Sequence, residues 1–118
     1  MDDVVAVITD LFFIVRIRSA AAAAGRTVRF AGNVQELMEG PLPSLVLVDL
    51  DAAVDVPGAI RLLKERGAVQ IVAFGPHLDT ETRKAARTAG ADRVLAKSKF
   101  VTELPALMQV KSTSTPGE

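Results

Sequence analysis

The chain has 118 residues, enough for one domain with a single hydrophobic core, and its 14 basic and 14 acidic side chains cancel. This balance argues against strong electrostatic binding to nucleic acid, and the absence of Tyr and Trp removes most of the rings on which single-stranded bases stack. The absence of Cys excludes disulfides, thiolate metal sites and cysteine nucleophiles. The N-terminus lacks a signal-peptide pattern, and no apolar run approaches the ~20 residues that span a bilayer. We therefore expect a cytoplasmic protein without a membrane segment.

Five short segments have the composition of buried strands. Three are apolar, β-branched runs, typical of strands that are covered on both faces. Two weaker segments follow glycine-containing turns. In chain order the predicted strands are 4–8, 27–30, 44–48, 69–74 and 93–96.

Helical signals fill the gaps between these strands. The first helix is predicted over 11–24, because Gly25 is a good C-terminal cap. The later helices are located by capping residues and by prolines of the first turn. They are expected to start at Asn33, near Pro57, at Asp79 or Thr80, and at Thr102, with Pro105 in the first turn of the last one.

The first helix carries more apolar side chains than one buried face requires. Its core-facing positions are expected to be Leu11, Ile14, Ile17 and Ala21. Phe12 and Val15 then point elsewhere, either under a neighbouring loop or into an exposed apolar patch that binds a partner. Both interpretations stay open at this point.

Strands and helices alternate along the whole chain. Parallel neighbouring strands need crossover connections, usually helices, so this order predicts a parallel sheet with right-handed crossovers. The expected fold class is α/β, with a doubly wound, flavodoxin-like sheet of five parallel strands, (βα)5. In such a sheet, ligands bind beyond the carboxyl ends of the strands, near the point where the strand order reverses.

Charged side chains follow three of the predicted strands. Asp10 follows the first, Asp49 and Asp51 follow the third, and Lys97 follows the fifth. The carboxyl ends of parallel strands meet at one edge, so we expect these side chains to surround one acidic pocket that also holds an ammonium group.

This pattern resembles the receiver domain of bacterial response regulators, in two-component signalling, over roughly residues 3–110. The resemblance implies that Asp49 is the phosphoacceptor and that Lys97 contacts the phosphoryl group. Asp10, Asp49 and the backbone carbonyl of Asp51 would then bind Mg²⁺. It also implies a protein partner, a histidine kinase or a downstream effector, with a homodimer as a further option.

Four positions depart from the receiver pattern. Thr9 replaces the first acid of the pair, and Gly75 stands where the phosphate-binding hydroxyl is expected. Val94 replaces the switch aromatic, and Ser98 replaces the proline after the lysine. These departures favour a degenerate receiver, with weak metal binding and doubtful phosphorylation, over a fully phosphorylatable one.

Two other functions remain as alternatives. A small-molecule or nucleotide-binding flavodoxin-like domain could use the same crevice, although no glycine-rich phosphate loop follows the first strand. An aspartyl-phosphate hydrolase would need Asp51 to turn inward as a second acid. We favour a signalling module that is not an enzyme, formed by residues 1–110, with a disordered tail over 111–118.

Overall fold

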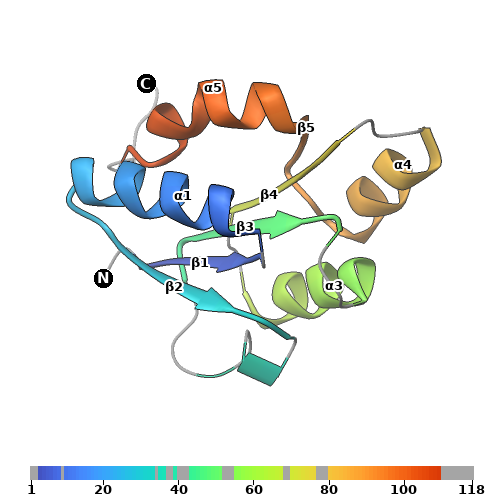
Figure 1. The fold of residues 1–118 in the computed structure, drawn as a ribbon. Helices are drawn as coiled ribbons and strands as arrows, with labels where there is room; N and C mark the ends of the chain where they lie inside the picture. The colour runs from blue at the N-terminus through green and yellow to red at the C-terminus, as the bar shows by residue number, and fades with distance from the viewer. Residues whose placement is uncertain are drawn as a thin grey trace, which may run out of the picture.

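A computed structural model of the chain describes residues 3–8, 10–33, 35–36, 39, 43–51, 55–67, 70–76 and 80–109. Within these residues there are five strands and four helices, which alternate except that the third strand follows the second directly (Figure 1). The strands are β1 (Asp3–Val7), β2 (Thr27–Ala31), β3 (Leu45–Asp49), β4 (Gln70–Gly75) and β5 (Arg93–Ala96). The helices are α1 (Leu11–Ala23), α3 (Val56–Arg66), α4 (Thr80–Ala89) and α5 (Lys97–Leu107).

The five strands form one parallel sheet in the order β2-β1-β3-β4-β5. This confirms the doubly wound α/β fold that the sequence predicts. The order reverses between β1 and β3, which pair directly although β2 lies between them in the chain. The point where a doubly wound sheet places its ligands therefore lies at the carboxyl ends of these two strands.

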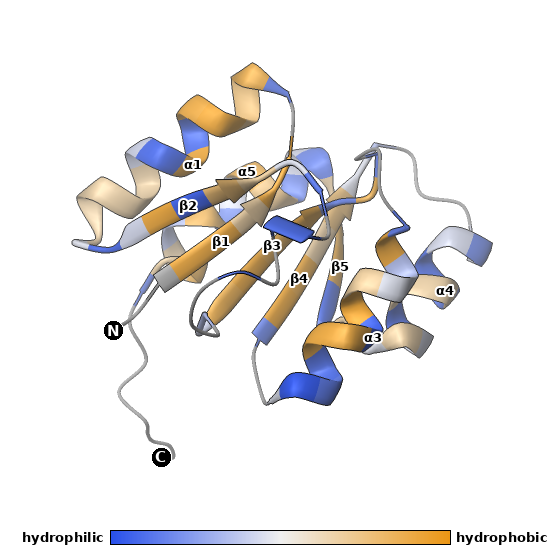
Figure 2. Cartoon of the chain, turned by 90° about the horizontal axis from the view of Figure 1, so that it is seen from below, coloured by the Kyte–Doolittle hydropathy of each residue, from blue (hydrophilic) through white to orange (hydrophobic). Residues whose placement is uncertain are grey.

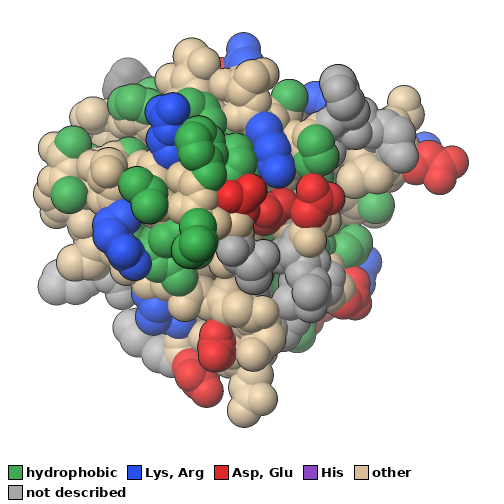
Figure 3. Space-filling view, in the orientation of Figure 1, with side chains coloured by type: hydrophobic (Ala, Val, Ile, Leu, Met, Phe, Trp, Pro, Cys, Tyr) green, Lys and Arg blue, Asp and Glu red, His purple; other side chains and the backbone are tan. Residues whose placement is uncertain are grey.

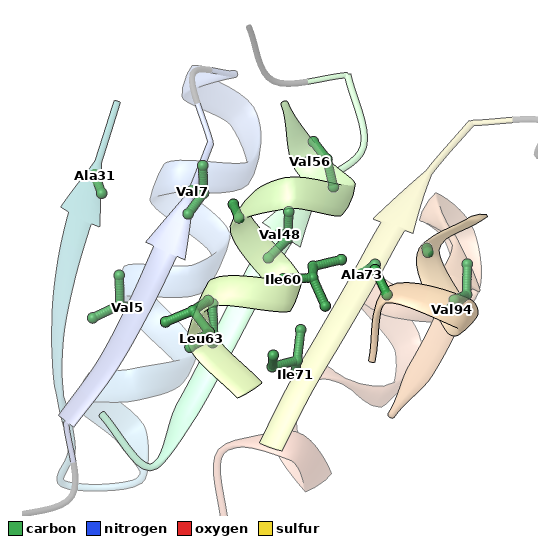
Figure 4. Close-up of a cluster of buried hydrophobic side chains, with 14 residues drawn as sticks. Val5, Val7, Ala31, Val48, Val56, Ile60, Leu63, Ile71, Ala73 and Val94 are labelled. Atoms are coloured by element: carbon green, nitrogen blue, oxygen red, sulfur yellow. The ribbon is translucent and has the colours of Figure 1, made fainter. Parts of the chain in front are cut away.

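Two hydrophobic layers cover the sheet. On one face, α1 and α5 pack over alternate strand residues, and this layer contains Phe13, Ile17, Phe74 and Phe100. On the other face, α3 and α4 cover the remaining strand residues, including Val48, Ile71 and Val94, and Ile60 of α3 packs against them (Figure 4). The strands are mostly hydrophobic along their length, as expected for a sheet that is buried on both faces (Figure 2).

Capping residues set several helix ends. Asp10 caps α1, because its Oδ1 accepts the Phe12 N–H at 2.9 Å, and Asp55 caps α3 by accepting the Gly58 N–H at 3.1 Å. Asn33 accepts the Glu36 N–H at 2.8 Å, which is one half of the predicted capping box, whereas the Glu36 Oε1 accepts the Gly32 N–H at 2.7 Å. The predicted cap Asp79 and the tail 111–118 lie outside the described residues.

The structure corrects the prediction for the last helix. It begins at Lys97 rather than at Thr102, so Pro105 lies inside the helix and not in its first turn. The earlier start brings Phe100 onto the same face as Leu104 and Met108, and all three are buried. Burial of this stripe outweighs the local capping signal of Thr102, whose hydroxyl instead donates to the Ser98 carbonyl at 3.0 Å.

The expected core face of α1 is also wrong at one position. Phe13, Ile17 and Ala21 are buried, Ile14 is half-buried, and Leu11 is 75% exposed. The inward stripe therefore repeats every four residues from Phe13, and this spacing turns Leu11 toward solvent. No helix in the described part of the chain is both long and apolar enough to cross a membrane.

Candidate functional site

The acidic side chains of the sequence pattern lie at the carboxyl edge of the sheet. Asp49 is the last residue of β3, and Asp10 is the cap between β1 and α1. Lys97 is the first residue of α5, directly after β5. The charges of Asp10, Asp51 and Lys97 all act on the Asp49 carboxyl. The fold therefore brings the four predicted site residues around the end of β3.

Asp49 is the one polar or charged side chain classed as buried among the described residues, with 3% of its surface exposed. Its Oδ1 accepts the Asp51 N–H at 2.8 Å, which fixes the orientation of the carboxyl group. Burial raises the pKa of Asp49 above its usual 3.8. The Asp51 N–H and the Lys97 charge lower the pKa, while the charges of Asp51 and Asp10 raise it. The site thus holds a carboxylate that would be stabilised by further positive charge.

Lys97 is not in a direct ion pair with Asp49 among the described residues. Its Nζ lies 5.2 Å from the ring centroid of Phe13, within the range of a cation–π contact. Phe13 in turn packs against Phe74 and Phe100, whose rings stack with centroids 3.9 Å apart. The Lys97 ammonium therefore lies over the Phe13 ring, which is itself supported by Phe74 and Phe100.

Phe13, which contacts Lys97, is not among the site residues that the sequence predicts. The signal was present, since Phe13, Ile17 and Ala21 follow one another at intervals of four residues. The predicted core face of α1 begins at Leu11 instead, and a helix face that begins there does not include Phe13. The structure thus adds Phe13 to the neighbours of the predicted lysine.

The positions that depart from the receiver pattern are also placed by the structure. Gly75 ends β4 and pairs with Ala96 of β5, next to the strand that ends in Asp49. Val94 is 2% exposed and belongs to the layer beneath α3 and α4. Thr9 lies outside the described residues.

The chemistry of the site suits a hard cation better than a soft one. Within the described ranges, no group of three or more His, Cys, Asp or Glu side chains could hold a metal ion. A metal here would depend on the carboxylates of Asp10 and Asp49, the Asp51 carbonyl and water. Each carboxylate uses one oxygen to accept a backbone N–H, so the other oxygen can serve as a ligand. Such an all-oxygen set with several waters fits Mg²⁺.

One structural role was not predicted from the sequence. Asp92, in the turn between α4 and β5, accepts the Ile71 N–H at 2.7 Å and pairs with Lys64 of α3 at 3.1 Å. The Asp92 N–H donates to the Ile71 carbonyl at 2.8 Å. Asp92 thus ties the start of β4 to the turn before β5, far from the carboxyl edge.

No protein-family model and no curated protein matches the sequence. Solved structures do match the fold. A response regulator of Burkholderia pseudomallei, solved with a phosphorylated aspartic acid, a calcium ion and citrate, superposes with a TM-score of 0.79 and 22% identity over 93% of this chain and 68% of that one. Response regulator RPA3017, of red light signalling in R. palustris, gives a TM-score of 0.76 and 17% identity over 100% of both chains.

A third match is the phosphorylated cyanobacterial phytochrome response regulator RcpA, with a TM-score of 0.76 and 15% identity over 99% of each chain. These identities are low, but the matches span nearly the whole of this chain. Its strand order and helix placement are therefore those of response-regulator receiver domains, and the chain has the receiver fold.

Proposed function

We propose that this chain is a receiver-like signalling module of a two-component or related regulatory pathway, with Asp49 as its phosphoacceptor. The observation that carries the proposal is the placement of Asp49. Its carboxyl is buried at the strand-order switch and lies among the charges of Asp10, Asp51 and Lys97. Burying a carboxylate is costly, and a functional role gives a reason for retaining it there.

Asp49 would act as the nucleophile. One of its carboxylate oxygens attacks the phosphorus of a phosphodonor, and the bond between phosphorus and the leaving group breaks as the new P–O bond forms. The product is an acyl phosphate on Asp49. Lys97, whose charge acts on the Asp49 carboxyl, would contact the transferred group. At ~4 Å and an effective dielectric near 20, one such charge pair gains about 4 kcal/mol before desolvation is subtracted.

Mg²⁺ is the cofactor that these residues would hold. When bound, it neutralises the acidic cluster and orients the phosphoryl oxygens. Asp10, Asp49 and the Asp51 carbonyl would be its ligands. The calcium ion in the phosphorylated Burkholderia response regulator supports a divalent cation in this fold. With two carboxylates in the set, we expect weak binding.

The conformational response to phosphate should be small. Gly75 has no side-chain hydroxyl and offers a phosphoryl group only its backbone N–H. Val94 is buried beneath α3 and α4 and has no aromatic ring that could change position. Phosphorylation shifts a conformational equilibrium only if the phosphoryl group interacts more favourably with one conformation than with the other. Gly75 and Val94 offer little interaction that could favour one conformation.

The module would therefore act through contact with a protein, such as a histidine kinase or a downstream effector, rather than by turning over a substrate. We place this activity in the cytoplasm, where the sequence predicts the protein to reside. Asp49 would be modified slowly, so the chain behaves as a degenerate receiver.

The test is incubation with acetyl phosphate and Mg²⁺, followed by intact-mass measurement and amide NMR. We expect slow, substoichiometric addition of one phosphoryl group, with spectral changes confined to the site. Asp49→Asn should abolish the addition, whereas Asp51→Asn, which keeps the backbone carbonyl, should retain it. Rapid, complete modification with broad shifts in α4 and β5 would contradict the degenerate form. Addition that persists in Asp49→Asn, or a pocket that takes neither phosphoryl nor Mg²⁺, would overturn the assignment of Asp49.

A further inference from the structure

The ammonium of Lys97 has two candidate neighbours at the carboxyl edge of the sheet. One is the Asp49 carboxyl, on which the Lys97 charge acts. The other is the ring of Phe13, whose centroid lies 5.2 Å from the Lys97 Nζ. Among the described residues, no ion pair joins Lys97 to a carboxylate. The ammonium therefore lies at the ring, and Asp49 has no direct counter-ion in the part of the chain that the structure describes.

Aromatic and acidic side chains meet at this edge. Figure 3 shows hydrophobic side chains gathered over the N-terminal part of α1, beside a group of acidic side chains. Phe13 is 5% exposed, and its ring centroid lies 5.5 Å from that of Phe74 and 6.1 Å from that of Phe100. Because the rings of Phe74 and Phe100 stack closely, Phe13 cannot turn away from Lys97 without disturbing the core. The ring is thus a fixed partner for the ammonium.

The backbone of Lys97 is equally well fixed. Lys97 is the first residue of α5, and Phe100, about one turn later, is fully buried. The preceding residue, Ala96, pairs with Gly75 of β4 in the sheet. Any change in the position of the ammonium therefore involves the flexible four-carbon stem of Lys97 rather than the backbone.

The position of the ammonium decides how one oxygen of Asp49 can be used. Oδ1 of Asp49 accepts the Asp51 N–H at 2.8 Å, which leaves Oδ2 as the oxygen for a metal ion or a phosphorus atom. A Lys97 ammonium in contact with Oδ2 would donate to its lone pairs and repel an incoming divalent cation. An ammonium at the Phe13 ring leaves Oδ2 open.

We propose that Phe13 is a positioning residue, whose ring holds the Lys97 ammonium away from the Asp49 carboxylate in the unmodified chain and so keeps Oδ2 of Asp49 available for Mg²⁺. The face of an aromatic ring carries the negative end of its quadrupole, which attracts a cation. The consequence for Mg²⁺ rests on the proposed function, whereas the ring contact does not.

The NMR signal of the Lys97 ε-methylene protons tests the ring contact without metal or phosphodonor. Protons over the face of a ring are shifted upfield, so this signal should lie upfield of that of Lys84, an exposed lysine on α4. Phe13→Leu should remove the shift. Phe100→Leu is the matched control, because it removes another buried ring of the same cluster and should preserve the shift. An unshifted Lys97 signal in the native chain, or equal losses in the two variants, overturns the proposal.

The Mg²⁺ dissociation constant, measured by titration of the Asp51 amide signal, tests the consequence for the site. Phe13→Leu should raise it about two- to fivefold, the factor that corresponds to an exposed cation–π contact. In a Lys97→Gln background, Phe13→Leu should change it little, because no ammonium is left to be positioned. An equal effect in both backgrounds shows that Phe13 acts through packing alone and overturns the proposal. A native chain that binds no Mg²⁺ contradicts the metal site of the proposed function, and the Lys97 signal still decides the ring contact.

Replacement of Phe13 by pentafluorophenylalanine separates the charge distribution of the ring from its packing. The fluorinated ring has nearly the same shape, but the sign of its quadrupole is reversed, so its face repels a cation. We expect a melting midpoint near that of the native chain and a rise in the Mg²⁺ dissociation constant like that of Phe13→Leu. A folded fluorinated chain with the native Mg²⁺ affinity overturns the proposal, even where Phe13→Leu does not fold.

Discussion

Helices α1 and α4 cover opposite faces of the same sheet, and their outward sides differ sharply. α4 turns Ala86 and Ala89 inward and exposes Arg83, Lys84 and Arg87 to solvent. α1 turns Phe13, Ile17 and Ala21 inward, yet it also exposes Leu11, Phe12 and Val15. The inward residues are explained by packing on the sheet, whereas the outward residues of α1 are not. Packing on the sheet therefore accounts for the inward residues of both helices, and it leaves Leu11, Phe12 and Val15 of α1 exposed.

The largest expected effect separates the two sides of α1. Ile17 is fully buried, so Ile17→Ala should lower the free energy of unfolding by about 2–5 kcal/mol. Val15→Ala, on the outward side, should change it by less than about 0.5 kcal/mol in dilute solution. Urea denaturation measures both. Equal losses would mean that the outward side is packed in the monomer, and the contrast with α4 would disappear.

The glycines that follow α1 and α4 allow a second comparison of the two helices. Gly25 follows α1 with φ of 71°, and an added Cβ would meet no atom within 4 Å. Gly90 follows α4 with φ of 126°, and an added Cβ would lie 2.6 Å from Lys64 Cγ. Gly25→Ala should cost about 1–2 kcal/mol from left-handed strain alone. Gly90→Ala should cost more, about 2–3 kcal/mol, and thermal unfolding of the pair gives the ranking. A Gly25→Ala loss as large as that of Gly90→Ala would remove the role of the Lys64 contact.

A smaller effect is expected at Asp49, the last residue of β3. Because burial raises the pKa of Asp49, the native state binds more protons than the unfolded state above pH 3.8. Stability therefore falls as pH rises from 3.8 through the folded pKa, and then levels off. Asp49→Asn keeps an oxygen for the Asp51 N–H but cannot ionise, so it should be more stable than the native chain at pH 7 and lose that advantage near pH 3.

The control for that measurement is Glu81→Gln, an exposed acid in the first turn of α4. This substitution removes an exposed carboxyl and leaves the Asp49 carboxyl in place. If Asp49→Asn follows the native pH profile, then the Asp49 carboxyl is not desolvated in the folded state.

Much of this architecture is readable in the sequence, because β-branched runs and helix caps are local signals. All five strands match their predicted positions to within one residue. The start of α5 and the inward stripe of α1 are not local, because they depend on which aromatic side chain reaches the core. Phe100 of α5 and Phe13 of α1 decide both, because they pack against each other and against Phe74 of β4. Pairwise packing of that kind has no signature in a single segment of sequence.

The candidate site is likewise predictable from the sequence only in part. Asp10, Asp49 and Lys97 are predicted from their positions after strands, since the fold brings strand ends together. The contact of the Lys97 ammonium with the Phe13 ring depends on the side-chain packing of α1, so it could not be predicted from the sequence. The raised pKa of Asp49 likewise depends on tertiary burial.

The central claim is that Asp49 is a buried carboxylate in a pocket that accepts a cation. An NMR titration of the side-chain carboxyl carbons, with and without saturating Mg²⁺, tests it most directly. Without metal, the Asp49 carboxyl should titrate above its usual pKa of 3.8. Mg²⁺ should lower that pKa, and Asp10→Asn should reduce the effect by removing a ligand. A normal Asp49 pKa that does not respond to Mg²⁺ would contradict the account.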